Sequence, residues 1–279
     1  MSRARTTSTG HEASDASWLD LHYRSSRAEY EHALSSVGIK TGWSVLDAGC
    51  GGGDFLPLLA EFVGTEGAIT ALDLAPENIA RVETLAREGR LPSGIVTKVG
   101  SLLDLPFPDA AFDCVWIANV AQYLTPAEFE TAVAEARRVL KPGGLLAIKE
   151  FDSHILQVLP MDSGAFSRFM NIRLATFATK GVLGTGSGTG IASRLRATGL
   201  TDITARGFLV ERWADCGADT KAYVRNLLSY FATVAPQYPL PSEDFATWQG
   251  VAANPERLLD DPGFCYREFF VLTLATMPG

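Results

Sequence analysis

The chain has 279 residues and a formal net charge of −8 at pH 7, from 24 Lys and Arg against 32 Asp and Glu. Such an acidic balance does not attract nucleic acids or anionic membranes, so neither partner is expected. Hydrophobic residues make up 47%, as in globular proteins with a sizeable core, and no apolar run reaches the roughly 20 residues of a membrane span. The four cysteines form no CxxC pair, which indicates neither a disulfide framework nor a metal site and favours the cytoplasm.

Residues 1–17 are rich in Ser, Thr and Ala and lack the apolar segment of a secretory signal, so we expect a disordered N-terminal tail. Apolar residues between 18 and 37 recur at helical spacing, which predicts a cap helix. This helix is also a candidate contact for homo-oligomer assembly.

From residue 38 onward, short β-rich runs alternate with helical segments, a pattern typical of βαβ units and a parallel sheet. The predicted strands are 43–48, 68–74, 94–99, 112–118 and 145–151. The predicted helices between them are 54–63, 76–88 and 126–140. We therefore expect a doubly wound α/β core over residues 38–151, with every helix on one face of the sheet or the other.

Strands and helices alternate less regularly in the remaining part, residues 152–279. The predicted helices there are 163–179, 191–198 and 220–234, and the predicted strands are 203–210 and 266–275. We expect the strands to complete the sheet. The segments 152–190 and 211–263 leave its C-terminal side.

A glycine cluster, Gly49, Gly51, Gly52 and Gly53, follows the first predicted strand directly. Glycines between a strand and a helix let a ligand lie against the backbone, and the helix N-terminus adds free N–H groups and a partial positive charge. Asp73 ends the second predicted strand about 20 residues later. In nucleotide-binding α/β sheets an acidic residue at this position accepts hydrogen bonds from ribose hydroxyls, so the pair predicts a nucleoside site.

Four segments carry a resemblance to one family: VLDAGCGGGDF (45–55), ALDLAPENI (71–79), GSLLDLPFPDAAFD (100–113) and RRVLKPGGLLAI (138–148). In this order they resemble the class I S-adenosylmethionine (SAM)-dependent methyltransferases, in particular the branch that acts on small molecules and natural products. The resemblance implies SAM as methyl donor and S-adenosylhomocysteine as product. It also implies a Rossmann-like sheet of seven strands whose last strand, here 266–275, is antiparallel. In this family, segments placed like 152–190 and 211–263 are insertions that cover the substrate, so the resemblance implies an inserted helical lid there.

The resemblance places the cofactor at Gly49, Gly51, Gly53, Asp73, Leu74, Ser101, Leu102 and Asn119. The glycines would border the methionine part, Asp73 would bind the ribose, and Leu74 would pack on the adenine. The asparagine would offer its backbone to the amino-acid end. Ser101 stands where the family commonly has Asp, which leaves recognition of the adenine amino group open. On the first helix, Tyr23 and Arg24 are candidates to close over the cofactor, and a solvated helix face is the alternative.

Dehydrogenases share this general fold, but their G-x-G-x-x-G pattern requires a glycine at position 54, which is Asp54 here. Nor does the pattern account for the LPFPDAAFD and LKPGG segments. We therefore interpret the chain as a methyltransferase, with a SAM-binding scaffold that lacks transfer activity as the alternative from another class.

The methyl acceptor is expected to be small and largely apolar. The segment 119–123 (NVAQY) lacks the two prolines that the amino-methylating enzymes of nucleobases and glutamine carry there. Aromatic residues are frequent in the lid segments, and packing is the alternative to pocket lining for them. Our candidates for substrate contact are Tyr23, Phe169, Phe177 and Tyr230. They suit an aromatic, prenylated or terpenoid-like product of secondary metabolism.

His154 and Glu150, near the end of the fifth predicted strand, are the candidates for a general base. The alternative for each residue is an exposed polar side chain at a strand end that has no catalytic role. An acceptor that is already nucleophilic needs proximity and desolvation more than a base, so N- or C-methylation by in-line displacement is favoured. O-methylation with His154 or Glu150 as base is the alternative.

Overall fold

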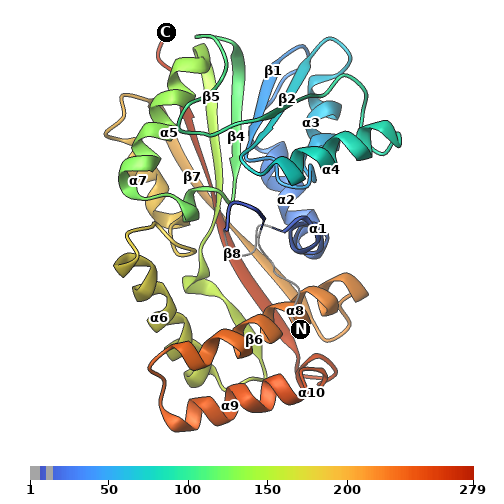
Figure 1. Cartoon of the computed structure of the whole chain (residues 1–279), viewed down its shortest axis with the longest axis vertical. Coiled ribbons are helices and arrows are strands. Elements are labelled where there is room, and N and C mark those ends of the chain that lie inside the picture. Colours follow the sequence, from blue (N-terminus) through green and yellow to red (C-terminus); the bar gives the residue numbers. More distant parts are fainter. Residues whose placement is uncertain (1–6, 11–14) are drawn as a thin grey trace.

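The computed structural model describes residues 7–10 and 15–279, and a mixed sheet runs through it (Figure 1). Its strands are β1 (Ser44–Ala48), β2 (Ala68–Asp73), β3 (Val96–Val99), β4 (Phe112–Ala118), β5 (Leu140–Phe151), β6 (Gln157–Leu159), β7 (Thr201–Trp213) and β8 (Cys265–Thr276). They follow the order β3-β2-β1-β4-β5-β8-β6, and β7 pairs with β8. The strands β1 to β5 are parallel, and β8 is antiparallel to its three neighbours. The predicted α/β class with an antiparallel last strand is confirmed, since β8 alone runs against the others, but the short β6 makes eight strands instead of seven.

Helices cover both faces of this sheet, as parallel strands require. They are α1 (Ala16–Ser25), α2 (Arg27–Ser35), α3 (Leu56–Val63), α4 (Pro76–Arg87), α5 (Pro126–Val139), α6 (Ser163–Thr179), α7 (Ile191–Leu195), α8 (Ala218–Val234), α9 (Ser242–Ala253) and α10 (Glu256–Leu259). Alternate residues of β4 feed two separate cores: Cys114 and Trp116 pack with α2 and α3, and Val115 and Ile117 pack with α5. The near-continuous apolar sequence of β4 follows from this burial on both sides.

A third apolar core holds the lid together. Helices α6, α8 and α9 pack around Phe166, Phe169, Phe231 and Trp248 at the end of the molecule opposite to α5 and β4 (Figure 1). Helix α1 joins this core through Trp18, whose ring lies edge-on to that of Tyr223, with the centroids 5.4 Å apart. The lid therefore has its own hydrophobic centre and contacts the α/β core through α1 and the long strands β7 and β8.

The N-terminal region differs from the prediction in its boundaries. The single helix expected over 18–37 is two helices, α1 and α2, which meet at Ser26. Helix α1 begins at Ala16, within the predicted tail, because the side chain of Asp15 caps it by accepting a hydrogen bond from the N–H of Ser17 (3.0 Å). Ser8 donates its hydroxyl to Glu77 Oε2 (2.9 Å). The rest of the predicted tail, 1–6 and 11–14, lies outside the described residues.

Phe169 provides a test of the lid core. Its fully buried ring lies 4.7 Å from that of Trp248 and 5.3 Å from that of Phe231. We expect Phe169→Ala to lower the free energy of unfolding by about 3–5 kcal/mol, as for large-to-small changes in cores. Phe177→Ala, later in the same helix and only half-buried, should cost about 1 kcal/mol. Urea unfolding measures both, and equal costs would contradict this assignment.

Candidate functional site

The turn after β1 is shaped by glycines in the left-handed region. Gly49 has φ +87° and Gly51 has φ +53°, conformations that cost an L-residue with a Cβ. The N–H groups of Gly49 and Cys50 donate to the Leu72 carbonyl on β2, at 2.7 and 3.0 Å. The backbone of the turn is thus held against β2 and forms a floor made largely of glycine backbone.

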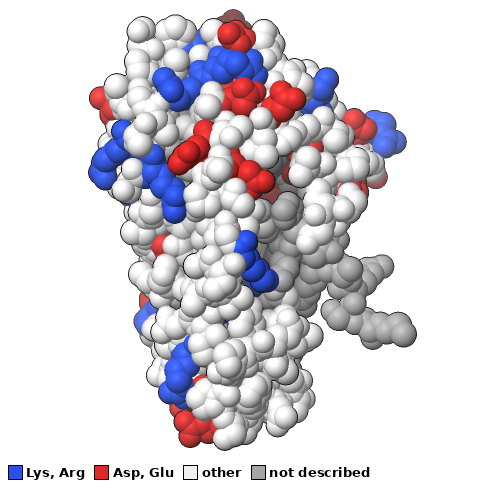
Figure 2. Space-filling view, turned by 60° about the vertical axis from the view of Figure 1, so that its left-hand side comes forward, with Lys and Arg blue, Asp and Glu red and all other residues white. Residues whose placement is uncertain are grey.

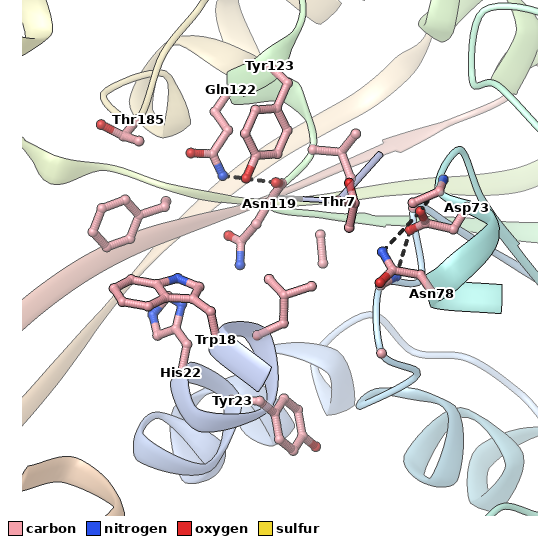
Figure 3. A pocket seen from close by; sticks show the side chains of 18 of the residues that line it. Thr7, Trp18, His22, Tyr23, Asp73, Asn78, Asn119, Gln122, Tyr123 and Thr185 are labelled. Atoms are coloured by element: carbon pink, nitrogen blue, oxygen red, sulfur yellow. Dashed lines mark hydrogen bonds between the residues drawn. The ribbon is translucent and has the colours of Figure 1, made fainter. Parts of the chain in front are cut away.

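Asp73, the last residue of β2, ties this floor to the next helix. Its Oδ2 accepts from the N–H of Gly51 (2.8 Å), and its Oδ1 accepts from the N–H of Ala75 (2.8 Å) and from Asn78 Nδ2 (3.2 Å), as Figure 3 shows in part. A carboxylate offers about four acceptor positions, so capacity for a ligand donor remains. The residue that follows, Leu74, leaves 48% of its surface exposed.

A cavity of about 320 Å³ begins at this floor and extends under the lid. Its sheet-edge wall includes Gly49, Gly51, Gly52, Asp73, Leu74, Ser101, Leu102 and Asn119. Its other wall includes Trp18, His22, Met170, Arg173, Tyr223, Leu227, Tyr230 and Phe231. In Figure 3, Trp18 and His22 point from α1 toward the polar side chains that follow β4. One cavity therefore has a backbone-lined end at the sheet and an aromatic end under the lid.

Most of the predicted cofactor residues line this cavity. They are Gly49, Gly51, Asp73, Leu74, Ser101, Leu102, Asn119 and Tyr23. Gly53 does not, because its Cα faces Leu56 and Val82 in the core. Arg24 does not either: its half-exposed guanidinium pairs with Asp20 (3.3 Å) and Asp219 (3.2 Å) on the outer side of α1.

The predicted substrate residues divide in the same way. Tyr230 lines the cavity, whereas Phe169 is in the lid core and Phe177 lies outside the lining. Tyr23 touches the cavity edge, but its ring turns toward Phe55, 5.1 Å away, and burial raises the pKa of its hydroxyl, as does Glu31. The hydroxyl oxygen of Tyr230 accepts a hydrogen bond from the Arg173 guanidinium at 3.2 Å.

The two predicted bases lie outside the cavity lining. The side chain of His154 is 60% exposed, and its Nδ1 lies 2.6 Å from Asp152 Oδ1. Glu150 is fully buried, and burial raises its pKa to about 7, against the opposing effects of Lys149 and of nearby backbone N–H groups. The structure therefore does not bring these two side chains together with the glycine turn.

His22 lines the cavity, although the sequence predicted no role for it. Its Nε2 lies 2.9 and 3.1 Å from the two carboxylate oxygens of Glu268 on β8, and 3.0 Å from the Tyr30 hydroxyl. Glu268 is fully buried. Burial alone raises its pKa, but His22 and hydrogen bonds from Ser26 and Tyr266 outweigh burial and hold it at about 2. The partners are 246 residues apart, so local sequence patterns hold no signal for them.

Carboxyl groups gather beneath the glycine turn. Burial raises the pKa of Asp47 to about 8, and the nearby Asp73 and Asp54 raise it further. Burial also raises the pKa of Asp54, a cavity-lining residue, to about 6, with Asp20 adding to the effect and Arg81 and Arg24 opposing it. Mutual repulsion of this kind is relieved when a cation binds nearby.

Within residues 7–10 and 15–279, His, Cys, Asp and Glu side chains form no group of three suited to hold a metal ion. No helix there is long and apolar enough to cross a membrane.

Comparisons with known proteins agree with this geometry. Residues 46–148 match the family described as "Methyltransferase domain". Over 125 residues the chain is 33% identical to a sterol 24-C-methyltransferase of Gibberella zeae, covering 44% of this chain and 32% of that protein. It is 38% identical over 121 residues to a ubiquinone/menaquinone biosynthesis C-methyltransferase of Cupriavidus taiwanensis, covering 42% and 47%. The chain thus spans between a third and about half the length of these curated relatives.

A solved structure extends the fold comparison to nearly the whole chain. A crystal structure titled as a putative methyltransferase from Bacillus halodurans matches with a TM-score of 0.56 at 17% identity, over 89% of this chain and 98% of that one. At this identity the match concerns the fold, and it includes the region outside residues 46–148.

The close approach of Gly49 to Val120 allows a test of the glycine turn. A Cβ on Gly49 would overlap Cγ2 of Val120, and its φ of +87° disfavours any other residue. We expect Gly49→Ala to lower the free energy of unfolding by about 3 kcal/mol, from overlap and backbone strain together. In a Val120→Ala background, the cost should fall by about 1 kcal/mol or more, measured by urea unfolding. A cost independent of Val120 would contradict the contact.

Glu268 predicts a pH effect on stability. Its folded pKa of about 2 lies below its usual 4.5, so its contribution is fully present above pH 4.5 and disappears as the pH falls toward 2. Between pH 7 and pH 3, the wild type should lose about 2 kcal/mol more unfolding free energy than Glu268→Gln. Urea unfolding at several pH values measures this, and a difference that does not change with pH would disprove the lowered pKa.

Proposed function

We propose that this chain, which carries a class I SAM-dependent methyltransferase domain, transfers a methyl group from SAM to a small, largely apolar metabolite. The observation that carries the proposal is the single cavity, open to the glycine turn at one end and lined by lid aromatics at the other. A donor and an acceptor placed in one cavity react without a bimolecular encounter, and enclosure by the lid excludes water.

The residues at the sheet edge fit the nucleoside of SAM. Asp73 keeps acceptor capacity beside the floor, which suits ribose hydroxyls, and Leu74 offers an exposed apolar surface to the adenine. Ser101 and Leu102 lie in the same wall. Gly49 and Gly51 would leave room for the methionine part, and the backbone of Asn119 would serve its amino-acid end. Bound there, SAM supplies an electrophilic methyl group on a cationic sulfur.

The electrostatics of this end favour such a cation. Burial raises the pKa of Asp47 and that of Asp54, and the nearby Asp73 and Asp54 add to the rise at Asp47, so a positively charged ligand would offset this repulsion. A nucleic acid carries the opposite charge. On the face in Figure 2, Lys and Arg side chains are interspersed with Asp and Glu rather than joined in a basic patch. These charges support a small-molecule acceptor rather than a polyanion.

The aromatic end of the cavity supports an apolar acceptor. Trp18, Tyr223, Tyr230 and Phe231 contribute rings, and Met170 contributes an adaptable side chain. Since His154 and Glu150 lie outside this lining, O-methylation through either of them has less support than N- or C-methylation. We also propose a role in natural-product metabolism and a cytoplasmic location, the latter supported by the four free cysteines.

Ligand binding tests the nucleoside site. We expect SAM and S-adenosylhomocysteine, each near 1 mM, to raise the melting temperature by several degrees, because a ligand at about 100 times its Kd adds roughly 2.7 kcal/mol. NAD should have no effect. Adenosine should bind about 10-fold or more tightly than 2′,3′-dideoxyadenosine, because hydrogen bonds to a charged group contribute about 1.5–3 kcal/mol. Asp73→Ala should abolish that preference, measured by calorimetry.

Asp113→Ala is the matched control. Asp113 lies near the start of β4, where it accepts from the Ser44 N–H and from Lys141, both at 2.8 Å, and it is absent from the cavity lining. This variant should retain the preference for the ribose hydroxyls. A rise in melting temperature with NAD alone would overturn the proposed function, and an Asp73 variant that still prefers adenosine would overturn the ribose contact.

A further inference from the structure

His22 is an ionisable side chain that lines the aromatic end of the cavity. It follows Trp18 by one turn of α1, and its side chain retains 12% exposure. Its ring is stacked on that of Tyr223 from α8, with centroids 4.5 Å apart and planes 5° from parallel. The stacking and the bonds at Nε2 together fix the orientation of the imidazole.

The carboxylate behind His22 is held by further hydrogen bonds. Glu268 accepts from the Ser26 hydroxyl at 2.6 Å and from the Tyr266 hydroxyl at 2.5 Å, in addition to facing His22. An ionised carboxylate can only accept hydrogen bonds, so Nε2 of His22 must be the donor to Glu268. In a neutral imidazole the single ring proton therefore lies on Nε2. Nδ1 then carries the lone pair. Among the described residues, Nδ1 makes no hydrogen bond, as the interactions of His22 involve Nε2 and the ring faces.

Other ionisable groups surround this pair. The Tyr30 hydroxyl from α2 lies 3.0 Å from Nε2. On β5, the Lys149 ammonium lies 3.6 Å above the Tyr30 ring and donates to Asn119 Oδ1 at 2.8 Å. Burial lowers the pKa of this lysine to about 7, against the effects of Glu268 and Glu150. The positive groups near Glu268 thus include Lys149, Arg212 and, when it is protonated, His22.

We propose that His22, oriented by Glu268, is the general base that takes a proton from the methyl acceptor, and that the acceptor is a phenol or enol on an apolar body. This inference rests on the proposed methyl transfer. A histidine whose second nitrogen bonds to a buried carboxylate is suited to the role, because the carboxylate fixes the tautomer and stabilises the imidazolium that forms.

The acceptor class follows from what a base adds to this cavity. A neutral amine is already nucleophilic, whereas a phenol or enol becomes a good nucleophile when it loses its proton. The surrounding rings of Trp18, Tyr223 and Tyr230 suit an aromatic body. A hydroxyl directed at His22 would place the ionising atom of such an acceptor against the one imidazole among the described lining residues.

The transfer step balances. A bond forms between the methyl carbon and the acceptor oxygen, or the ring carbon beside it, as the carbon–sulfur bond breaks and its electron pair stays on sulfur. The hydroxyl proton passes to Nδ1 of His22. After attack by carbon, the ring carbon's proton returns to the oxygen. The positive charge that began on sulfur ends on the imidazolium, which Glu268 stabilises until the proton leaves to water.

Imidazole nitrogen NMR of the full-length, ¹⁵N-histidine-labelled chain with S-adenosylhomocysteine tests the tautomer without any acceptor. The chain has four histidines, and His22→Gln assigns the signal by its loss. We expect a ring whose neutral form carries its proton on Nε2. A neutral form protonated on Nδ1, or a ring that stays doubly protonated up to pH 9, would overturn the proposal.

Transfer to a phenolic probe tests the chemistry. With 2-naphthol and SAM, we expect His22→Gln to lower kcat by about 100-fold or more, as general bases typically contribute 10²–10⁴. Its Kd for SAM should remain within about twofold of wild type, which shows that the variant is folded. His32→Gln is the matched control, because His32 is exposed on α2 and stacks edge-on to Phe208, away from the cavity.

The outcomes separate this inference from the proposed function. If the wild type does not bind SAM, the proposed function fails, whatever tautomer His22 adopts. If SAM binds but 2-naphthol is not methylated, or is methylated equally by His22→Gln, the assignment of the base and its acceptor class fails alone. Glu268→Gln should give a smaller loss of kcat than His22→Gln and shift the pH profile to lower pH, an effect that loss of packing alone would not produce.

Discussion

Strand β8 continues beyond the end of β5, and its ladder with β7 runs along its whole length, from Cys265 paired with Trp213 to Thr276 paired with Thr201. Its second half pairs with β5, in register from Phe270 to Thr276, and its first residues pair with β6 in the lid. Backbone hydrogen bonds thus hold the α/β core and the lid to one strand. A strand fixed at both ends cannot slip, since a one-residue shift would turn every side chain to the other face.

This register decides where the buried polar groups lie. Tyr266 and Glu268 alternate with the strand period, so both point to the face that α1, α2 and α8 cover. A buried carboxylate without partners would be very unfavourable. Glu268 is instead satisfied by groups from three elements: His22 on α1, Ser26 at the junction with α2, and Tyr266 on its own strand. The position of α1 over the cavity therefore depends on a charge in the sheet.

The parts of the structure that local sequence determines were predictable. Helix α6 and strand β4 have the predicted bounds, because apolar runs and caps are properties of neighbouring residues. The glycine turn and Asp73 were likewise identified from spacing along two consecutive βα units. Short β6 was missed, since three residues carry no periodic signal. Only the tertiary structure distinguishes lid residues that line the cavity from those in the lid core. Phe169 is buried in the core, whereas its neighbour Met170 lines the cavity.

His22 shows that local sequence also limits the prediction of candidate catalytic residues. On sequence alone, His154 was the stronger candidate, because it follows a strand whose end lies at the ligand-binding edge. In the structure that side chain turns to Asp152 and solvent, whereas His22 reaches a carboxylate far away in sequence. What distinguishes them is burial. Both carboxylates are buried, but the His154 ring is 60% exposed, so water screens its interaction with Asp152. The side chain of His22 is only 12% exposed, and beneath α1 the lower effective dielectric constant lets the charge of Glu268 act strongly on the imidazole. The aromatic rings at the lid end of the cavity therefore also strengthen the action of Glu268 on His22.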